Sequence, residues 1–391
     1  MGKLRFATAI RDFSRRKGGA ERYLVDLCAR MTSEDFEVHV YAEHWEEEVE
    51  GIHFHRVETI PFPKSARLLS FAVRATKAIE RGNYDVTLGV GNTLKADVLQ
   101  PHGGVHWAWF WRSLSAYDHP ILWMIKFIVR VLSPKQWING YIEDAPYKNK
   151  RCNKIIAISD MVKRDMIRWY GIPENRIAII YNGVDIERFH PRNGQYREEI
   201  RARYGIGHEF LILFISNNFR MKGLGYLIKA LADIKQKDYP LFRLLVLGRD
   251  RKNLYLRMAK KLGISERVIF VGSTDEPEKY YGAADLLVHP SFYDACSLSV
   301  LEALASGLPV VTTYANGAMG MVDHGEDGWV VKDPKDLDEI TEGILYFVSE
   351  AARHRASNRG RRKMESHSEE VNFSRMMKIF RETIQDRSYT S

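Results

Sequence analysis

The sequence predicts an α/β protein made of two doubly wound domains, each a parallel sheet with helices on both faces. At 391 residues the chain is too long for one ordinary core and fits two domains. It opens with strand, glycine-containing loop, helix and strand, the start of a doubly wound domain. A second alternation of strands and helices begins at the buried strand Phe210–Ile215, without repeating the first sequence.

Composition sets broad bounds on the protein class. An apolar fraction of 45% with 28% charged residues is typical of a globular protein. The net charge of +8 favours an anionic partner or surface, although so modest an excess fits many partners. Three scattered cysteines indicate reduced thiols in a cytoplasm and match no zinc spacing. No stretch has the length of a membrane span.

The first domain is expected over residues 1–190. A helix is predicted from Ala20 to Met31, and the exit from the domain follows Asn182. Short apolar runs predict its strands at Leu4–Ile10, Val38–Ala42, Ile52–Val57, Asp85–Val90, Val98–Gln100, Lys154–Ser159 and Arg176–Tyr181.

The second domain is expected over residues 200–370. A final amphipathic helix, 373–391, is expected to pack back on the first domain. Helices are predicted at Gly225–Ile234 and after Ser297, which reads as an N-cap. The predicted strands are Phe210–Ile215, Leu244–Gly248, Val268–Gly272, Asp285–His289, Val310–Thr313 and Trp329–Val331.

The stretch 284–313 carries the strongest indication of function. Its loop, Ser291–Cys296, follows a parallel strand and leads into a helix, which is where open α/β sheets bind ligands. Free N–H groups at the helix start favour an anion, whereas Asp294 and Glu302, with seven residues between them, suit sugar and ribose hydroxyls. Together they fit a nucleotide sugar. The alternative is a solvated loop Asp and a surface Glu.

Three other positions suit a ligand, and each has a plainer alternative. Gly18 and Gly19 before a helix allow a close backbone approach, or simply form a tight turn. Lys222 and Arg220 at a helix start suit a diphosphate, or are a solvated pair. His102 ends a strand beside two glycines, although isolated histidines are more often structural.

The stretch 290–310 resembles the donor-site signature of the family 4 retaining glycosyltransferases. That signature has Pro-Ser, an acid, seven residues, Glu-Ala and then Gly-x-Pro-Val, and Asp294 stands where the family usually has Glu. His102 matches the family's His-Gly motif, and Lys222 its Lys-Gly. The family's Arg before that Lys is Asn217 here, so Arg220 corresponds to it by charge alone.

The resemblance implies a GT-B fold, in which two Rossmann-like domains face a cleft with the acceptor side first. It implies retaining transfer of a hexose, with glucose favoured, from a nucleotide diphosphate sugar, with a UDP-sugar favoured. The acceptor is expected to be a glycan or lipid-linked glycan such as lipopolysaccharide core. A GT-B epimerase or phosphorylase, or a non-catalytic Rossmann-type nucleotide-binding protein, are the alternatives. The sequence has no dedicated catalytic acid pair that would favour an epimerase or phosphorylase. It also has no G-x-G-x-x-G after the first strand, which argues against a Rossmann-type nucleotide-binding protein.

The resemblance also implies roles for individual residues. Asp294, His102 and Glu21, the last from the family's Gly-Gly-x-Glu, are the expected catalytic residues. No cofactor is expected, and no metal either, because no Asp-x-Asp triplet ends a strand. The expected donor-binding residues are Gly18, Gly19, Arg220, Lys222, Ala295, Cys296, Ser297, Leu298 and Glu302.

Residues 106–137 hold five of the eight tryptophans, with Lys126, Arg130 and Lys135 interleaved. This pattern suits an anionic membrane surface, or else a buried helix that lines the cleft. The expected location is therefore cytoplasmic, with peripheral attachment to the inner face of the membrane. The basic stretch 353–363 is expected to be a solvated helix face, and no nucleic acid is expected because no recognised module accompanies it.

Overall fold

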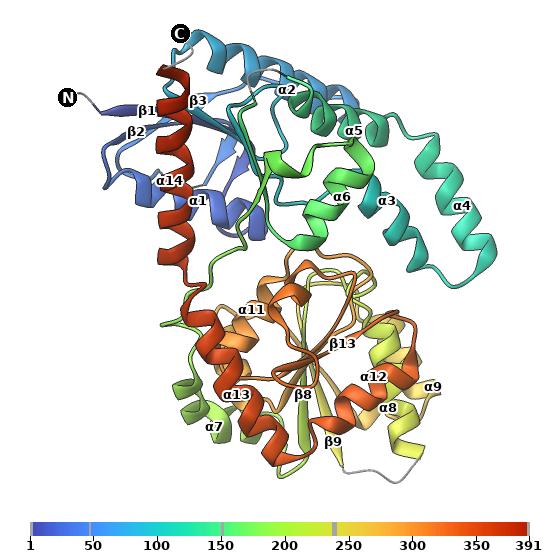
Figure 1. The fold of residues 1–391 in the computed structure, drawn as a ribbon. Helices are drawn as coiled ribbons and strands as arrows, with labels where there is room; N and C mark the ends of the chain where they lie inside the picture. Colours follow the sequence, from blue (N-terminus) through green and yellow to red (C-terminus); the bar gives the residue numbers. More distant parts are fainter. Residues whose placement is uncertain (1–2, 47, 150–151, 237–240, 389–391) are drawn as a thin grey trace. The chain divides into compact units, whose positions relative to one another are not determined.

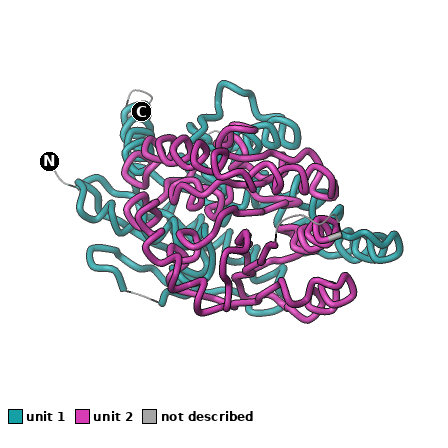
Figure 2. The backbone as a smooth tube through the Cα atoms, turned by 90° about the horizontal axis from the view of Figure 1, so that it is seen from below, with its two compact units in different colours: residues 1–180, 373–391 teal, residues 181–372 magenta. Residues whose placement is uncertain are grey.

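The computed structural model describes residues 3–46, 48–149, 152–236 and 241–388 of the chain (Figure 1). It divides into two compact units (Figure 2). The first contains Met1–Ile180 together with Phe373–Ser391, and the second contains Tyr181–Asn372. The end of the chain thus belongs to the same unit as its beginning.

The first unit is a seven-stranded parallel sheet in the order β3-β2-β1-β4-β5-β6-β7. Every predicted strand of this unit is present, so the doubly wound expectation is confirmed. The strands are β1 Leu4–Phe13, β2 Phe36–Trp45, β3 Ile52–Arg56, β4 Val86–Gly89, β5 Val98–Leu99, β6 Lys154–Ala157 and β7 Ile177–Ile179. The helices are α1 Gly19–Met31, α2 Lys64–Arg81, α3 His106–Ser115, α4 Pro120–Val131, α5 Pro134–Tyr147, α6 Asp160–Tyr170 and, from Phe373 onward, α14 Glu369–Ser388.

Both faces of this sheet are buried because apolar residues occupy consecutive positions of β1. Phe6 belongs to a core with α1 and α14, whereas its neighbour Ala7 belongs to a core with α2. Successive side chains of a strand point to opposite faces, so an unbroken apolar run requires helices on both sides. The Phe380 ring of α14 lies 5.3 Å from the Phe6 ring, which holds the last helix on this sheet.

The second unit is a six-stranded parallel sheet in the order β10-β9-β8-β11-β12-β13. The order reverses between β8 and β11, and ligands bind at such a switch point in doubly wound sheets. The strands are β8 Phe210–Ile215, β9 Phe242–Leu247, β10 Val268–Gly272, β11 Leu286–His289, β12 Val310–Thr313 and β13 Gly328–Val331. The helices are α7 Arg197–Arg203, α8 Leu224–Gln236, α9 Asn253–Lys261, α10 Pro277–Ala283, α11 Leu298–Ala305, α12 Leu337–Tyr346 and α13 Glu350–Glu365.

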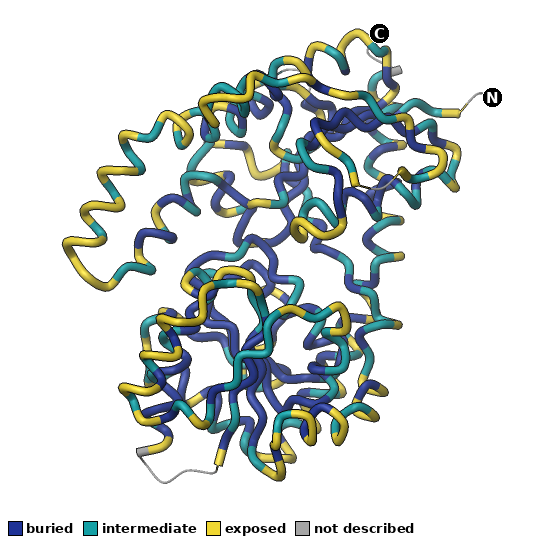
Figure 3. The backbone as a smooth tube through the Cα atoms, turned by 180° about the vertical axis from the view of Figure 1, so that it is seen from behind, coloured by how far each residue is buried: buried dark blue, intermediate teal, exposed yellow. Residues whose placement is uncertain are grey.

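The tryptophan-rich segment forms α3, α4 and α5, and α4 contains no buried residue. The expectation of a buried helix is therefore wrong for α4, which Figure 3 shows as largely exposed. Trp123 and Phe127 stack on each other with ring centroids 5.4 Å apart, on the side of α4 that meets the protein. Among the described residues, no helix combines the length and apolar character needed to cross a membrane.

The basic stretch 353–363 is not simply a solvated face of α13. Arg361 donates hydrogen bonds to the backbone oxygens of Phe189 and Ala305, at 3.1 and 3.2 Å. Lys363 pairs with the buried carboxylate of Asp327 at 2.5 Å. The expectation was wrong here because a pattern of charges does not reveal which cations reach carbonyls and acids of neighbouring elements.

Candidate functional site

Two loops meet at the switch point of the second unit, one after β8 and one after β11. The backbone N–H of Phe292 donates to the oxygen of Met221 at 2.8 Å, which ties the loops together. Gly223 has φ +76°, and a Cβ at this position would lie 2.1 Å from the oxygen of Pro290. A residue other than glycine would therefore push the loops apart.

This contact brings two expected site residues together. The ammonium of Lys222 lies 2.5 Å from a carboxylate oxygen of Asp294 and 3.1 Å from the backbone oxygen of Tyr293. The two side chains are 18% and 19% exposed, so the protein covers most of the ion pair but leaves it accessible to a ligand. A cation and an acceptor carboxylate thus lie side by side at the point where the strand order reverses.

A third loop, after β12, fixes the backbone of Asp294. Its N–H donates to Ala315 and its carbonyl accepts from Gly317, at 3.0 and 2.7 Å. The buried side chain of Asn316 accepts from the N–H of Ser297 at 3.3 Å. Sequence reasoning missed Asn316, and the Ser297 amide that was expected to meet an anion already has this partner.

The remaining expected loop residues lie around the start of α11. Ala295, Cys296 and Ser297 are buried, and Leu298 is the first residue of the helix. Ser297 occupies the N-cap position as predicted, but its hydroxyl makes no capping hydrogen bond. That hydroxyl lies 3.5 Å from Nδ1 of His289 instead.

Two buried residues that sequence reasoning missed position the site. The Tyr281 hydroxyl on α10 donates to a carboxylate oxygen of Glu302 at 2.7 Å. His289 ends β11, where burial lowers its pKa to about 3 and keeps it neutral. Its Nδ1 lies 3.1 Å from the Ser291 hydroxyl at the start of the loop. A buried tyrosine and a strand-end histidine carry no distinguishing spacing in the sequence.

Arg220 lies in the same loop as Lys222, between β8 and α8. Its charge acts on Tyr255 of α9, although burial dominates there and raises the pKa of Tyr255 to about 12. Lys222 instead faces Asp294. The joint action of the two cations on a diphosphate therefore stays a prediction.

In the first unit, the expected residues gather at the carboxyl ends of β1 and β5. Gly18 and Gly19 begin α1, and the Glu21 carboxylate folds back to within 2.6 Å of where a Cβ on Gly18 would stand. The rings of Tyr23 and His102 are 4.1 Å apart. Burial lowers the pKa of His102 to about 3, and its Nε2 has no hydrogen-bond partner among the described residues.

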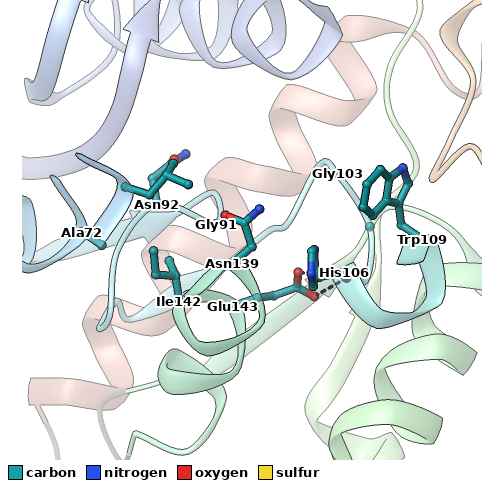
Figure 4. Close-up of a pocket in the computed structure, with 11 residues that line it drawn as sticks. Ala72, Gly91, Asn92, Gly103, His106, Trp109, Asn139, Ile142 and Glu143 are labelled. Atoms are coloured by element: carbon teal, nitrogen blue, oxygen red, sulfur yellow. Dashed lines mark hydrogen bonds between the residues drawn. The ribbon is translucent and has the colours of Figure 1, made fainter. Parts of the chain in front are cut away.

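A separate cavity of about 330 Å³ lies in the first unit, between α2, α3, α5 and the loops after β4 and β5 (Figure 4). Both carboxylate oxygens of Glu143 accept from the backbone N–H of His106, at 3.0 and 3.1 Å. Burial raises the pKa of Glu143 to about 8 and lowers that of His106 to about 4. Both side chains are therefore mainly uncharged at neutral pH.

Glu143 should make the first unit less stable as the pH rises from 5 to 8. Its folded pKa lies above the unfolded value, so folding takes up a proton in this window and stability falls with rising pH. Glu143→Gln keeps an oxygen for His106 but cannot ionise. Relative to the wild type, it should gain roughly 3 kcal/mol between pH 5 and 8, measured by urea unfolding. Parallel pH profiles for the two proteins would refute this.

One group of possible metal ligands, Glu37, His39 and His53, lies on β2 and β3. Nε2 of His39 is 2.7 Å from Glu37, so this carboxylate already has a partner. The rings of His39 and His53 are stacked 22° from parallel, with centroids 4.8 Å apart. Nitrogen lone pairs lie in the ring plane, so stacked rings direct them side by side and not toward one ion. The group therefore gives no support for a metal centre.

Comparison with family models matches both halves of the chain. The model described as Glycosyltransferase Family 4 matches residues 17–188, and Glycosyl transferases group 1 matches residues 196–363. An uncharacterized glycosyltransferase of Methanocaldococcus jannaschii is 32% identical over 204 residues, which are 50% of this chain and 51% of that protein. Lipopolysaccharide glucosyltransferase WaaG of Escherichia coli is 25% identical over 85% of this chain and 87% of its own length.

Other comparisons extend the likeness. D-inositol 3-phosphate glycosyltransferase of Thermomonospora curvata is 25% identical over 82% of this chain and 80% of its own length. The crystal structure of WaaG superposes with a TM-score of 0.78 at 20% identity, over 96% of this chain and 99% of that one. Anabaena HepE in complex with UDP-glucose gives a TM-score of 0.69 at 19% identity, over 98% and 100%. These structural likenesses identify the fold.

Proposed function

The chain belongs to the family 4 glycosyltransferases of the GT-B fold, and on this premise we propose that it transfers a hexose from a UDP-sugar to a glycan or lipid-linked glycan. The transferred hexose is glucose, and its anomeric configuration is retained. The observation that carries the proposal is the ion pair of Lys222 and Asp294 at the switch point of the second unit. The likeness to a lipopolysaccharide glucosyltransferase over most of the chain supports this choice of sugar and acceptor.

Donor binding separates this ion pair in the proposed mechanism. The diphosphate competes with Asp294 for the ammonium of Lys222, and the first-turn amides of α11 add further donors. The released carboxylate of Asp294 then accepts hydrogen bonds from the sugar hydroxyls. Glu302, held by Tyr281, accepts from the ribose. Charge grows on the diphosphate as its bond to the sugar breaks, so these contacts strengthen in the transition state.

In the first unit, His102 and Glu21 serve the reacting sugar and the acceptor, with Gly18 and Gly19 admitting the donor phosphates. His102 is neutral, so it acts through hydrogen bonding and not as a cation. The bond from sugar to phosphate breaks as the bond from sugar to acceptor oxygen forms. The acceptor's proton leaves with the diphosphate.

We expect transfer to survive chelation of divalent metals. Lys222 and the helix amides neutralise the leaving group in the proposed mechanism, so a metal ion is not required. The test incubates the protein with UDP-[¹⁴C]glucose and a bacterial glycolipid extract, with EDTA or with magnesium. Equal label in the glycolipid is expected in both arms. Activity lost in EDTA and restored by magnesium contradicts the metal-free mechanism, and no labelled glycolipid in either arm contradicts the proposed function.

The exposed face of α4 is the proposed site of peripheral attachment to a membrane on the cytoplasmic side. At 100° per residue its apolar side chains cover an arc of about 160°. Trp111 and Trp137 on the flanking helices are also exposed, and Lys126 borders the arc. The exposed apolar residues are Ile121, Leu122, Met124, Ile125, Ile128, Val129 and Leu132.

Arg130 does not contribute to this surface. Its guanidinium donates to the oxygen of Phe110 and the hydroxyl of Ser113, at 3.1 and 2.6 Å, and lies over the Trp109 ring. The interpretation of Arg130 as a cation that faces lipid is therefore wrong. Membrane binding should depend mainly on apolar insertion and only weakly on salt.

The double variant Ile125→Glu, Ile128→Glu should lose vesicle binding by at least about tenfold, because two apolar side chains no longer enter the interface. Both positions are exposed, so folding should be unaffected. The measurement is co-sedimentation with phosphatidylethanolamine–phosphatidylglycerol vesicles. Leu254→Glu, an equally exposed leucine on α9, is the matched control and should bind normally. If the wild-type protein stays in the supernatant, the proposed attachment to a membrane is wrong.

A further inference from the structure

The cavity of the first unit offers side-chain amides that the protein itself does not use. Asn92 follows β4 and Asn139 lies on α5, and neither side chain hydrogen-bonds to another described residue. Each amide has two donor hydrogens and an acceptor oxygen for a ligand. Nε2 of His106 is buried without a partner as well. Figure 4 shows these side chains around the same space as Trp109, whose indole adds an apolar wall.

The same cavity lacks a cation. Among the described residues that line it, the ionisable ones are His106 and Glu143, and no Lys or Arg is present. Burial keeps His106 neutral and Glu143 largely protonated near pH 7. A phosphate or carboxylate would therefore lose its hydration without an ion-pair partner on the cavity wall, because Lys135 and Arg130 act on His106 and Trp109 from outside the lining. The cavity discriminates in favour of an uncharged ligand with many hydroxyls.

We propose that this cavity binds one neutral pyranose ring of the acceptor glycan, an inference that rests on the proposed glycosyl transfer. A volume of about 330 Å³ is at the small end for ligand sites, which suits a single ring. Free amides suit hydroxyls, and the missing cation excludes a sugar phosphate or cyclitol phosphate. The acceptor then differs in chemical class from D-inositol 3-phosphate, for which five of the relatives are named.

The position of the cavity agrees with an acceptor carried on a lipid. The helices that line it, α3 and α5, also flank the exposed helix α4. Trp109 lies on α3, which leads into α4, and Asn139 lies on α5, which follows α4. At a rise of 1.5 Å per residue, each of these lining residues is about 10 Å or less along its helix from the end beside α4. A sugar in the cavity can thus remain attached to a lipid whose chains lie beside the apolar face of α4.

Saturation-transfer NMR without any donor tests the proposal. The probes are the methyl glycosides of glucose, galactose, mannose and L-glycero-D-manno-heptose, with D-myo-inositol 3-phosphate as the anionic comparison. At least one neutral glycoside should bind, and the phosphate should not. Asn92→Ala and Asn139→Ala should each weaken that binding about fivefold, the usual effect of one lost hydrogen bond. Alanine favours the helix at Asn139, so folding should be retained.

Asn153→Ala, an exposed asparagine before β6, is the matched control and should bind the glycoside like the wild type. The thermal unfolding curve of each variant, compared with that of the wild type, checks that the first unit is folded. A double variant combines Asn92→Ala with Asn139→Ala. The proposal is overturned if no neutral glycoside binds, if the double variant binds it as the wild type does, or if inositol phosphate binds and the double variant loses it. Because no donor is present, these results are separate from the test of nucleotide-sugar transfer.

Discussion

Lys222→Ala should lower turnover by roughly 100- to 1,000-fold, the usual loss when one group that stabilises transition-state charge is removed. Its ammonium lies at the switch point, 2.5 Å from a carboxylate oxygen of Asp294. UDP should also bind more weakly, because the diphosphate meets Lys222 in the ground state as well. Removing Lys222 further leaves Asp294 as a carboxylate that is only about one-fifth exposed and lacks its cation.

The measurements are UDP release under steady-state conditions and calorimetric titration with UDP. Lys260→Ala, an exposed lysine of α9, has the same chemistry outside the site and should behave like the wild type. Because Lys222 and Asp294 touch, the double variant should lose less than the sum of the two single losses. Normal turnover in Lys222→Ala would remove this side chain from the leaving-group site.

Asp294→Ala should lower transfer by roughly 100-fold or more while leaving UDP binding nearly intact. Asp294 acts on the sugar in the proposed mechanism, and its loss leaves Lys222 with only the backbone oxygen of Tyr293, so that the ammonium becomes more available to the diphosphate. Glu302→Ala should differ, because the ribose contact already exists in the ground state and its loss weakens UDP binding itself. Kinetics and calorimetry on both variants separate the two roles. Equal damage to UDP binding in both would place Asp294 outside the sugar site.

Asp294→Glu tests the departure from the family signature. The carboxylate already reaches Lys222 at 2.5 Å, and the loop is fixed on both sides by Ala315 and Gly317. An added methylene therefore has little room, and turnover should fall by about tenfold or more. Unchanged turnover, or a changed hexose preference, would indicate that the site has room for the longer side chain at position 294. The matching control is Asp333→Glu, an exposed acid after β13.

The strands could be predicted because each is a short apolar run that must be covered on both faces. Phe210–Ile215 and Val310–Thr313 were placed to the residue. The ends of other strands were less certain, since β1 continues to Phe13 through the polar residues Arg11 and Asp12. Pairing with β2 extends β1 through these residues, and such backbone pairing cannot be predicted from the hydropathy of the side chains.

The candidate site could be found from one loop and its resemblance, but its internal contacts could not. Lys222 and Asp294 are 72 positions apart, and nothing in either motif states that they touch. Tyr281 and Asn316 look like ordinary core residues until the fold directs them at Glu302 and Ser297. The prediction for Arg130 was wrong for the opposite reason. Its charge suggested a role at the surface, but in the structure it donates a hydrogen bond to Ser113 of α3.

Binding of a nucleoside diphosphate is the measurement that tests the central claim most directly. A thermal-shift screen of ADP, GDP, UDP and their glucose conjugates requires neither an acceptor nor a variant. UDP and UDP-glucose should stabilise the protein, by about 2.7 kcal/mol at a hundred times the dissociation constant. Lys222→Ala should reduce that shift. If no nucleoside diphosphate or its sugar raises the melting temperature, the switch point of the second unit is not a donor site and the account is wrong.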